Sequence, residues 1–514
     1  MSVFKSFFFN RENKSFQYLF LLVILSTVIK VALIGKGFLA LPDEMRYFTS
    51  GKAVTNFMNL KIGAGINALY NTHARPGDAF LKMIPHFFQI KLAEFNNTPL
   101  YSPQNSYPLF IYNFLILICI EFILYRFSVL IFKDKLKAIF NVLIFSCLTN
   151  SFIYLRHALP YDESLLFFYL TIYLLIKQTL YKKMNIIKYF LLGGLAFFSY
   201  LCYPGYFPLY LIIIGYLFFK GLSRQSFIKN TFNSIYFGLG SLSVLLLIEF
   251  TAYKVGESYL KDAAILSQTI LQGSFEESYT FIFKYLFEAE FIAGYLLIIS
   301  IVTVAFILIF KFKESLKEFG PDLILIISIA TIIYLFYGTL GFFFHKFVMY
   351  GRLIHQYLPI ISFIGTLFVF KLIGDKKNLL LLISVAYIIS FIYNIYQFNG
   401  VVYPRDKSWE LSKKYNLKNI ENIYEYKRCF PEFPLEQFNN NHSNDYKILT
   451  LNLCYIPHPS KAKEYIEFQN KNKSSMIYNK THFNNLKSYQ FEGFTIKERQ
   501  LSDKMKLKVK IFKK

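Results

Sequence analysis

Two adjacent carboxylates, Asp43 and Glu44, follow the first long apolar segment of the chain, within the motif Leu-Pro-Asp-Glu-Met-Arg-Tyr at residues 41–47. A carboxylate at the surface of a membrane can reach a lipid headgroup and a polar acceptor together. A structural interpretation fits the same spacing, because Pro42 ends the apolar segment and Asp43 is a good N-cap for a helix that starts there. The dipeptide alone leaves chemistry and capping both open.

A second acidic pair, Asp162 and Glu163, ends an eight-residue stretch that begins with Arg156 and His157. This stretch opens the fourth apolar segment, on the same predicted side of the membrane as the first pair. Asp162 is again a reasonable helix cap. Four ionisable side chains in eight residues beside a bilayer are nevertheless dense, so all four are candidates for binding a substrate.

A third polar cluster lies at the start of the tenth apolar segment and contains Lys346, Arg352, His355 and Tyr357. Arginine binds phosphate through two parallel hydrogen bonds, so a cation here could hold the phosphate of a lipid. Basic side chains at helix ends also reach toward water without any binding role. Against that simpler explanation, the other short connections on this side carry few basic residues.

The polar stretch 38–107, which follows the first apolar segment, is too long for a simple connection. Its turn at 73–78 contains His73 and Arg75, which could line a cavity or only begin the next helix. The residues that follow divide at helical spacing into an apolar and a polar face, namely Phe80, Ile84, Phe87 and Phe88 against Lys82, His86 and Gln89. This pattern predicts a helix in the membrane interface, and 45–58 is a second candidate.

Composition predicts the scaffold that positions these motifs. Hydrophobic residues make up 54% of the 514 residues and charged residues 17%, whereas soluble domains carry about 25% charged residues. The apolar residues fall in blocks of about 20, the length of helix that crosses a bilayer. We therefore expect a mostly α, polytopic membrane protein and argue against a soluble enzyme. The eleven expected spans are 16–37, 108–132, 138–155, 163–181, 188–203, 205–221, 231–253, 290–311, 321–344, 353–373 and 379–398.

The basic residues predict an orientation. With the N-terminus in the cytoplasm, the short inside segments hold three or four Lys or Arg each, whereas the short outside connections hold few. This distribution accounts for much of the net charge of +24, and we do not expect nucleic acid as a partner. The predicted location is the inner (plasma) membrane, where membrane lipid is a partner. The first segment is too long for a cleaved signal peptide and should remain as an anchor.

The chain changes composition near residue 400, so we expect a membrane domain over 1–398 and a small extracytoplasmic α/β domain over 399–514. Within this tail, 446–456 and 506–512 have the pattern of strands and 461–470 that of a helix. An outside location would permit a disulfide between Cys429 and Cys454 without establishing one. The sequence contains no nucleotide-binding or common hydrolase motif in a suitable context, which argues against ATP-driven transport.

Charged residues inside the apolar segments need partners. Lys30 and Glu121 lie where they could pair across two antiparallel helices, and we expect this pair to be structural. Arg126 and Glu249 have no assigned role. These charges leave a transporter or flippase as an alternative function, although no internal repeat supports it.

The arrangement of motifs resembles the GT-C glycosyltransferases that use polyprenyl-phosphate sugars, and is similar to the protein O-mannosyltransferases and the lipid A aminoarabinose transferases. The resemblance rests on Asp43-Glu44 followed by Arg46-Tyr47 in a long first outer loop, on the stretch 156–163, and on the late span that begins at 351. The architecture covers nearly the whole chain and implies a GT-C-like fold, although the specific residues are few. An extracytoplasmic C-terminal domain also occurs in parts of this group, but the sequence of the tail resembles no domain in particular.

By this resemblance, Asp43 is the expected catalytic base, or positions the acceptor, and Glu44 supports it. The implied reaction is inverting transfer of a sugar from a polyprenyl-phosphate donor to an extracytoplasmic glycan, lipid or protein. A carboxylate can activate the acceptor, and cations can neutralise the departing phosphate. Relatives often place a Lys or Arg where this chain has Tyr203-Pro204-Gly205. The expected substrate- and phosphate-binding residues are Arg46, His73, Arg75, Arg156, His157, Asp162, Glu163, Lys346, Arg352, His355 and Tyr357.

Some relatives use a divalent metal and others need none. Asp43, Glu44, Asp162 and Glu163 could supply oxygen ligands for Mg²⁺ or Mn²⁺, although no His or third acidic motif fixes a geometry. A lipid-linked oligosaccharide polymerase or ligase is a further alternative. Such an enzyme would rely on outer-loop Arg and His residues, here residues 156 and 157, more than on the acidic pair after the first span.

Overall fold

A computed structural model of the whole chain provides the structure of the protein. The residues that it describes are 14–34, 49–70, 75–97, 100, 103–180, 185–220, 227–271, 281–311, 313, 319–344, 351–374, 376–400, 449–453, 487–491, 494–502 and 505–511. Side chains of the four strands after residue 448 are not among the described features, so those strands are discussed as backbone alone.

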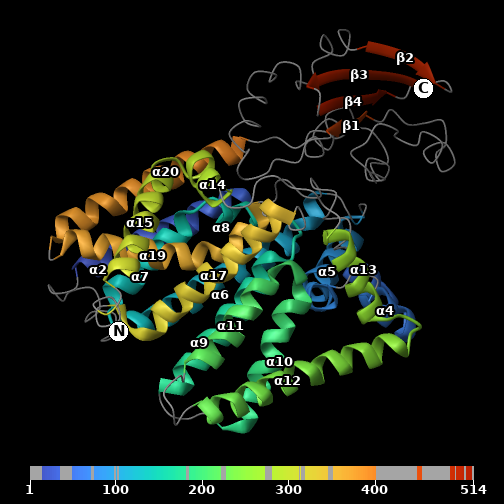
Figure 1. Cartoon of the computed structure of the whole chain (residues 1–514). Helices are drawn as coiled ribbons and strands as arrows, with labels where there is room; N and C mark the ends of the chain where they lie inside the picture. The colour runs from blue at the N-terminus through green and yellow to red at the C-terminus, as the bar shows by residue number, and fades with distance from the viewer. Residues whose placement is uncertain are drawn as a thin grey trace, which may run out of the picture.

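The described chain is mostly helical, as the composition predicts (Figure 1). Apolar runs form helices in lipid because a helix satisfies all its backbone hydrogen bonds within the segment. The first half contains α2 (Lys14–Lys30), α3 (Thr49–Met58), α4 (Ile62–Tyr70), α5 (Pro76–Asn96), α6 (Tyr107–Phe132), α7 (Lys135–Cys147), α8 (Asn150–Ile153), η5 (Tyr154–Arg156), α9 (Tyr161–Leu180), α10 (Ile186–Cys202), η6 (Pro204–Tyr206) and α11 (Phe207–Phe219). The second half contains α12 (Phe227–Tyr253), α13 (Tyr259–Leu271), α14 (Phe281–Ala289), α15 (Phe291–Phe310), α17 (Pro321–Phe344), α18 (Gly351–Ile354), η7 (His355–Tyr357), α19 (Leu358–Ile373) and α20 (Lys377–Gly400).

Seven helices among the described residues are long and apolar enough to cross a membrane, and an eighth candidate is a bent pair. The seven are Lys14–Leu33, Tyr107–Phe132, Ile228–Tyr253, Phe291–Phe310, Pro321–Phe344, His355–Ile373 and Asn378–Asn399. Seven of the eleven predicted spans coincide with these helices and the span over 138–155 coincides with the bent pair, whereas α9, α10 and α11 are helices that are not among these candidates. The result supports a mostly α polytopic membrane protein. However, α11 has 13 residues and is about 20 Å long, against a hydrocarbon core of about 30 Å.

The predicted span over 138–155 is a bent pair of helices and not one straight helix. Here α7 is followed by α8 and η5, with a bend of 67° between the two parts. The backbone N–H of Thr149 donates to the carboxylate of Glu290 at 2.8 Å, and the N–H of Asn150 donates to the Tyr285 hydroxyl at 3.2 Å. Because side chains from the α14–α15 junction satisfy these backbone groups, the helix can break inside an apolar environment.

The predicted break between the fifth and sixth spans is confirmed. Helix α10 ends at Cys202, the single turn η6 follows, and α11 begins at Phe207. Pro204 opens η6 and Pro208 lies in the first turn of α11. Proline has no backbone N–H, so neither residue could continue α10 without losing a hydrogen bond.

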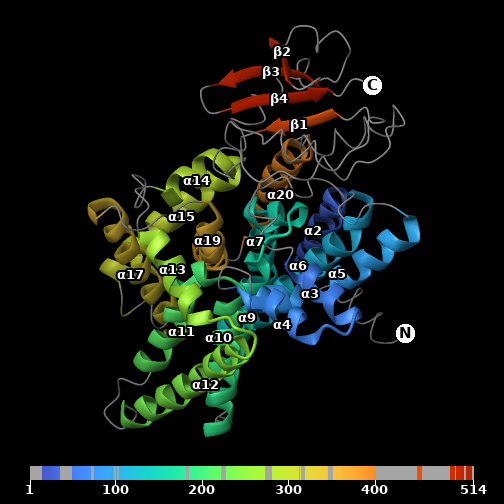
Figure 2. The same ribbon diagram turned by 90° about the vertical axis from the view of Figure 1, so that its right-hand side faces the viewer.

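Helix α7 is the centre of the bundle. Its ten residues from Ala138 to Cys147 are all buried. Helices α2, α6, α19 and α20 pack around it, and α15 packs against α19 and α20 (Figure 1). The long first loop forms a separate layer, in which α3, α4 and α5 pack on one another and α5 contacts α6 and α10 (Figure 2).

The tail contains a four-stranded antiparallel sheet in the order β1-β4-β3-β2. Its strands are β1 (Leu449–Leu453), β2 (Lys487–Phe491), β3 (Phe494–Ser502) and β4 (Met505–Ile511). The register pairs Leu449 with Ile511, and a bulge interrupts β3 between Gln500 and Ser502. Two strands therefore fall where the sequence predicts them, and β2 and β3 are additional. The predicted helix at 461–470 lies outside the described residues, as do both cysteines of the tail.

Candidate functional site

Three buried charged side chains join the first-loop helix α5 to the start of α9. The ammonium of Lys82 lies 2.5 Å from the Asp78 carboxylate, one helical turn earlier on α5, and 3.5 Å from the Glu163 carboxylate. Each of the three residues is at most 1% exposed. Apart from the ion pair with Lys82, neither Glu163 oxygen accepts a hydrogen bond from a residue that the structure describes. We call Asp78, Lys82 and Glu163 the buried triad.

A glycine allows α5 to approach α10 closely enough to bring the triad together. A Cβ atom on Gly77 would lie 2.9 Å from the backbone of Leu201 and Cys202, closer than real Cβ contacts come. Just before the helix, the Arg75 guanidinium lies 5.4 Å from the centre of the Tyr203 ring, within cation–π range. The first turn of α5 is therefore fixed against the α10–η6 junction.

The charges of the triad do not balance within these three residues, because two carboxylates face one ammonium. Burial raises the pKa of Asp78, and the positive charges of Lys82 and Arg75 oppose that rise. Burial lowers the pKa of Lys82, but the two carboxylates outweigh it, so the net pKa of Lys82 is raised. Lys82 is thus held in its charged form between the two carboxylates, and Arg75 adds a second positive charge that acts on Asp78.

The neighbouring carboxylate of α9, Asp162, has a different partner. Its Oδ1 lies 2.7 Å from Nε2 of His355, and both residues are buried. His355 opens η7, at the N-terminal end of α19, so this contact joins the fourth and tenth predicted spans. The other ring nitrogen of His355, Nδ1, has no hydrogen-bond partner among the described residues. Carboxylate–histidine contacts of this kind can hold or move a proton.

Tyrosine rings surround His355 and the start of α9. The ring centres of Tyr154 and Tyr206 lie 5.0 Å and 6.4 Å from that of His355. Tyr161 contacts Tyr154 at 4.8 Å and Tyr203 at 4.7 Å, both edge to face. The polar groups are therefore held in an aromatic setting, which strengthens electrostatic interactions by excluding water.

Three other predicted binding residues have packing contacts in the structure. Arg156 donates to the Phe398 carbonyl at 2.7 Å and its guanidinium lies 4.9 Å from the centre of that ring. The His157 carbonyl accepts a hydrogen bond from the Asn113 side chain at 2.8 Å. Tyr357 is buried, with its ring 5.7 Å from that of Tyr334. These contacts join η5 and η7 to other helices and give no direct support to a polymerase or ligase that relies on residues 156 and 157.

The residues predicted to carry the catalytic step are not among those described. Asp43, Glu44, Arg46, His73 and Lys346 lie outside the described ranges. The backbone of Arg352 belongs to α18, but its side chain is not described. The assignment of a catalytic base, and of cations that bind the lipid phosphate, therefore stays a prediction.

Sequence reasoning did not include Asp78 and Lys82 among the candidates. A signal was present, because an Asp and a Lys four residues apart on the polar face of a predicted helix can pair. Their pairing with Glu163 had no such signal, since it joins segments 81 residues apart in sequence. Glu290 was also missed, because an acid at the start of an apolar span has the same sequence pattern as an ordinary cap.

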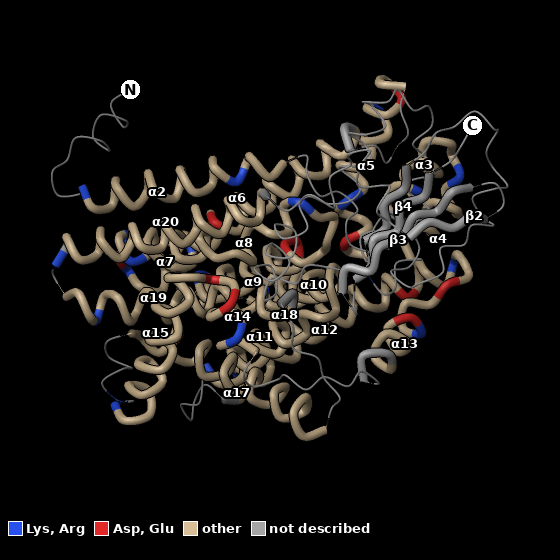
Figure 3. Tube along the Cα trace, turned by 90° about the horizontal axis from the view of Figure 1, so that it is seen from above, with Lys and Arg blue, Asp and Glu red and all other residues tan. Residues whose placement is uncertain are grey.

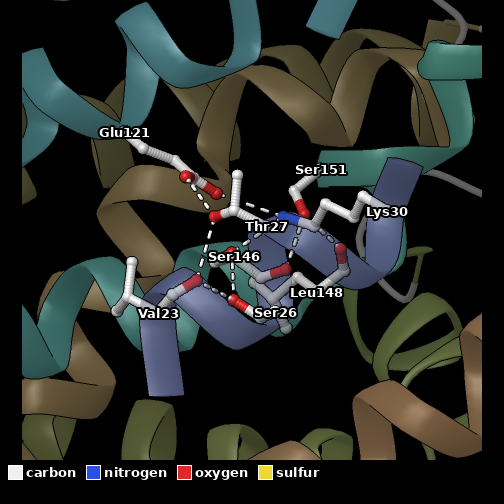
Figure 4. A network of polar contacts seen from close by, with 8 residues as sticks. All are labelled: Val23, Ser26, Thr27, Lys30, Glu121, Ser146, Leu148 and Ser151. Carbon is white, nitrogen blue, oxygen red and sulfur yellow. Dashed lines mark hydrogen bonds and ion pairs between the residues drawn. The ribbon is translucent and has the colours of Figure 1, made fainter. Parts of the chain in front are cut away.

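A second buried polar network surrounds the predicted pair Lys30–Glu121, which is confirmed at 3.1 Å (Figure 4). Lys30 also donates to Ser146 Oγ at 2.8 Å, and Thr27 donates to Glu121 at 2.9 Å. Ser26 and Ser146 are hydrogen bonded at 2.8 Å. The network ties α2 to α6 and to the last turn of α7, directly before the break in that span.

Among the described residues, no three His, Cys, Asp or Glu side chains lie close enough together to hold a metal ion. Asp162 and Glu163 have separate partners, a histidine and a lysine. The other two predicted ligands, Asp43 and Glu44, lie outside the described residues. A role for Mg²⁺ or Mn²⁺ stays a prediction.

Comparisons of the chain with protein-family models, curated proteins and solved structures give no match. The resemblance to GT-C glycosyltransferases therefore rests on the motifs of the sequence alone.

Proposed function

We propose that this protein is a membrane glycosyltransferase that moves a sugar from a polyprenyl-phosphate donor to an extracytoplasmic acceptor with inversion. In this proposal all eleven segments cross the inner membrane in a GT-C-like arrangement. The N-terminus is cytoplasmic, and the tail is an extracytoplasmic α/β domain. The acceptor is a glycan, a lipid or a protein.

The observation that carries the proposal is the meeting of three segments far apart in sequence. The first loop supplies Asp78 and Lys82, the start of α9 supplies Asp162 and Glu163, and η7 supplies His355. These are the three regions on which the resemblance rests. On α9, Asp162 contacts His355 of η7 and Glu163 contacts Lys82 of the first loop. The start of α9 therefore connects the other two regions.

The chemistry requires an acceptor hydroxyl to attack the anomeric carbon of the donor while the bond from that carbon to the phosphate oxygen breaks. The hydroxyl proton passes to a carboxylate, for which Asp43 is the proposed base. The departing polyprenyl phosphate gains negative charge, which Arg352 and Lys346 would neutralise. Lys82 fastens the first-loop helix to α9, and this contact would keep the loop over the start of that span.

Stability alone does not explain a buried triad. Taking charges out of water is so unfavourable that replacing a buried ion pair by apolar residues is often neutral or stabilising by about 1–4 kcal/mol. Perturbed ionisable groups that converge from several segments are typical of functional sites. The triad therefore supports a functional role for this end of α9, whatever the identity of the sugar.

The test uses the purified full chain in detergent with a panel of polyprenyl-phosphate sugars and extracted membrane acceptors. Release of free polyprenyl phosphate is measured by mass spectrometry. Asp43→Asn and Glu163→Gln should reduce release by about 100-fold or more, the usual range for losing a proton-transfer group or its support. Glu121→Gln is the matched control, since it also alters a buried carboxylate paired with lysine, but in the other network.

Normal turnover of Asp43→Asn would reject the assigned base. Equal loss in Glu163→Gln and Glu121→Gln, accompanied by loss of the folded protein, would mean that both pairs are structural.

A transporter is the second candidate, favoured by the break between α7 and α8. Transporter sites often lie at broken helices near the bilayer midplane, and this break has the buried residues Lys30, Glu121 and Glu290 around it. The two functions separate in one measurement. Sugar transfer in detergent supports the enzyme, whereas activity that requires sealed vesicles and depends on Lys30 supports the transporter.

A further inference from the structure

A pocket of about 220 Å³ lies at the lysine-rich end of the bundle, between the end of α6, the start of α7, the residues before α17 and the end of α19. Its lining consists of Ile131, Phe132, Lys133, Lys137, Phe319, Gly320, Leu367, Phe370 and Lys371. A single water molecule needs about 10–15 Å³ of cavity volume, so the pocket is large enough for a headgroup of the size of a phosphate. His355 lies before the opposite end of α19, which at 16 residues is about 24 Å long, so this pocket is separate from the candidate site.

Three lysines line the pocket, and none of the described residues that line it is acidic. The Lys137 ammonium lies 5.6 Å from the centre of the Phe370 ring, and the Lys371 ammonium lies 5.4 Å from that of Phe319. These cation–π contacts direct both charges over the aromatic walls of the pocket. Two acids are adjacent in sequence to lining residues. Asp134 accepts the backbone N–H groups of Leu136 and Lys137 as the N-cap of α7 and is not part of the lining, and Glu318 lies outside the described residues.

The rest of the lining is apolar and lies between membrane helices. The apolar walls, which an acyl chain could follow, consist of Ile131, Phe132, Phe319, Leu367 and Phe370. Leu372, next to Lys371, is 60% exposed, as expected of a side chain that contacts lipid. A pocket with a cationic end and apolar walls matches a phospholipid better than it matches a free anion.

Position supports the same ligand. Basic residues gather at the ends of α2, α7, α15, α19 and α20 on one side of the bundle (Figure 3). Basic pockets between membrane helices bind anionic headgroups, and each Lys or Arg near an anionic surface contributes about 1 kcal/mol. We propose that this pocket binds the phosphate headgroup of an anionic phospholipid, with Lys133, Lys137 and Lys371 as its ligands and with the acyl chains along the apolar walls.

The bound lipid would join α6, α7 and α19 to the start of α17. This assignment does not depend on the enzymatic proposal, because the pocket and the buried triad share no residue.

The test uses the full chain in detergent and native mass spectrometry to count bound lipid. Phosphatidylglycerol is the probe, phosphatidylcholine is the neutral comparison, and inorganic phosphate is the soluble competitor. The pocket variant combines Lys133→Gln, Lys137→Gln and Lys371→Gln. The matched control combines Lys135→Gln, Lys311→Gln and Lys376→Gln, which removes equal charge at the same end without altering the lining.

We expect the wild type and the control variant to retain one phosphatidylglycerol. The pocket variant should bind it about 100-fold more weakly, since three lysines at about 1 kcal/mol each exceed two factors of ten. Equal weakening in both variants would overturn the proposal in favour of diffuse attraction. Equal binding of phosphatidylcholine, or displacement of the lipid by inorganic phosphate, would also overturn it.

Discussion

Removing the Lys82 ammonium should destabilise the protein strongly, because two buried carboxylates would lose their shared cation. Lys82 is fully buried and lies 2.5 Å from Asp78 and 3.5 Å from Glu163. Breaking a buried ion pair by removing one partner costs about 3–5 kcal/mol. We expect Lys82→Met, which keeps an apolar stem of similar length, to lose about that much free energy of unfolding, measured by SDS titration in mixed micelles.

The loss should depend on pH with a defined sign. Burial already raises the pKa of Asp78, and without Lys82 only the more weakly acting Arg75 opposes that rise. A carboxyl with a raised pKa in the folded state stabilises the fold at low pH, and this contribution disappears as pH rises through the folded-state pKa. The deficit of Lys82→Met should therefore be smallest in acid and grow toward neutral pH.

A triple variant separates charge balance from function. Combining Asp78→Asn, Lys82→Met and Glu163→Gln removes all three charges, so most of the lost stability should return. Sugar transfer should not return, because the proposed site would still lack its ionisable groups. Lys30→Met is the control, since it breaks the other buried pair, Lys30–Glu121, and should destabilise without touching the triad. A triple variant as unstable as the single one would refute the charge-balance reasoning, and a triple variant with normal transfer would refute the site.

Two further changes test how α5 is held. Gly77→Ala should lower the free energy of unfolding by about 1–3 kcal/mol in a thermal unfolding assay and reduce any activity, because its Cβ would lie 2.9 Å from the backbone of Cys202. Gly63→Ala is the control and should have no effect in that assay, because a Cβ there would have no atom within 4 Å. Burial lowers the pKa of His86 to about 4, from the usual 6.5, so the wild type should lose about 3 kcal/mol as pH falls from 6.5 to 4. His86→Gln should flatten that loss, and an unchanged pH profile would contradict a neutral, buried His86.

The helices were predictable because their signal is local. Each predicted span is a run of apolar residues, and such a run in lipid can satisfy its backbone only as a helix. The break after α7 was not predictable in this way, because the group that accepts the Thr149 N–H is Glu290, 141 residues later. The sequence contains three polar residues, Thr149, Asn150 and Ser151, at the break, but small polar residues also occur in unbroken helices, and only the contact with Glu290 marks the break. The strands β2 and β3 were missed because their many charged and polar residues obscure the alternation that marks a strand.

The site was predictable as a set of segments and not as a set of contacts. The acidic pair of α9 was evident, but a good N-cap and a site carboxylate look alike in sequence. What distinguishes them is the partner, and for Asp162 that partner is His355, 193 residues away. The choice of Asp43 as base depended on the resemblance, so the described residues leave it a prediction.

The orientation of α5 links the membrane to the candidate site. An amphipathic helix of a soluble protein buries its apolar face, yet α5 buries Asp78, Lys82, His86 and Gln89 and exposes Phe80, Ile84, Phe87 and Phe88, which are 40–65% exposed. This arrangement is favourable when the surroundings of the outer face are apolar, as lipid is. Contact between lipid and the apolar face then holds α5 in place, while the opposite face directs Asp78 and Lys82 toward the interior of the protein. A chain that needed α5 only as a covering helix would place apolar residues on that inner face, because burying the two charges of Asp78 and Lys82 there gains no stability. The polar inner face is therefore the strongest reason to look for chemistry at the start of α9.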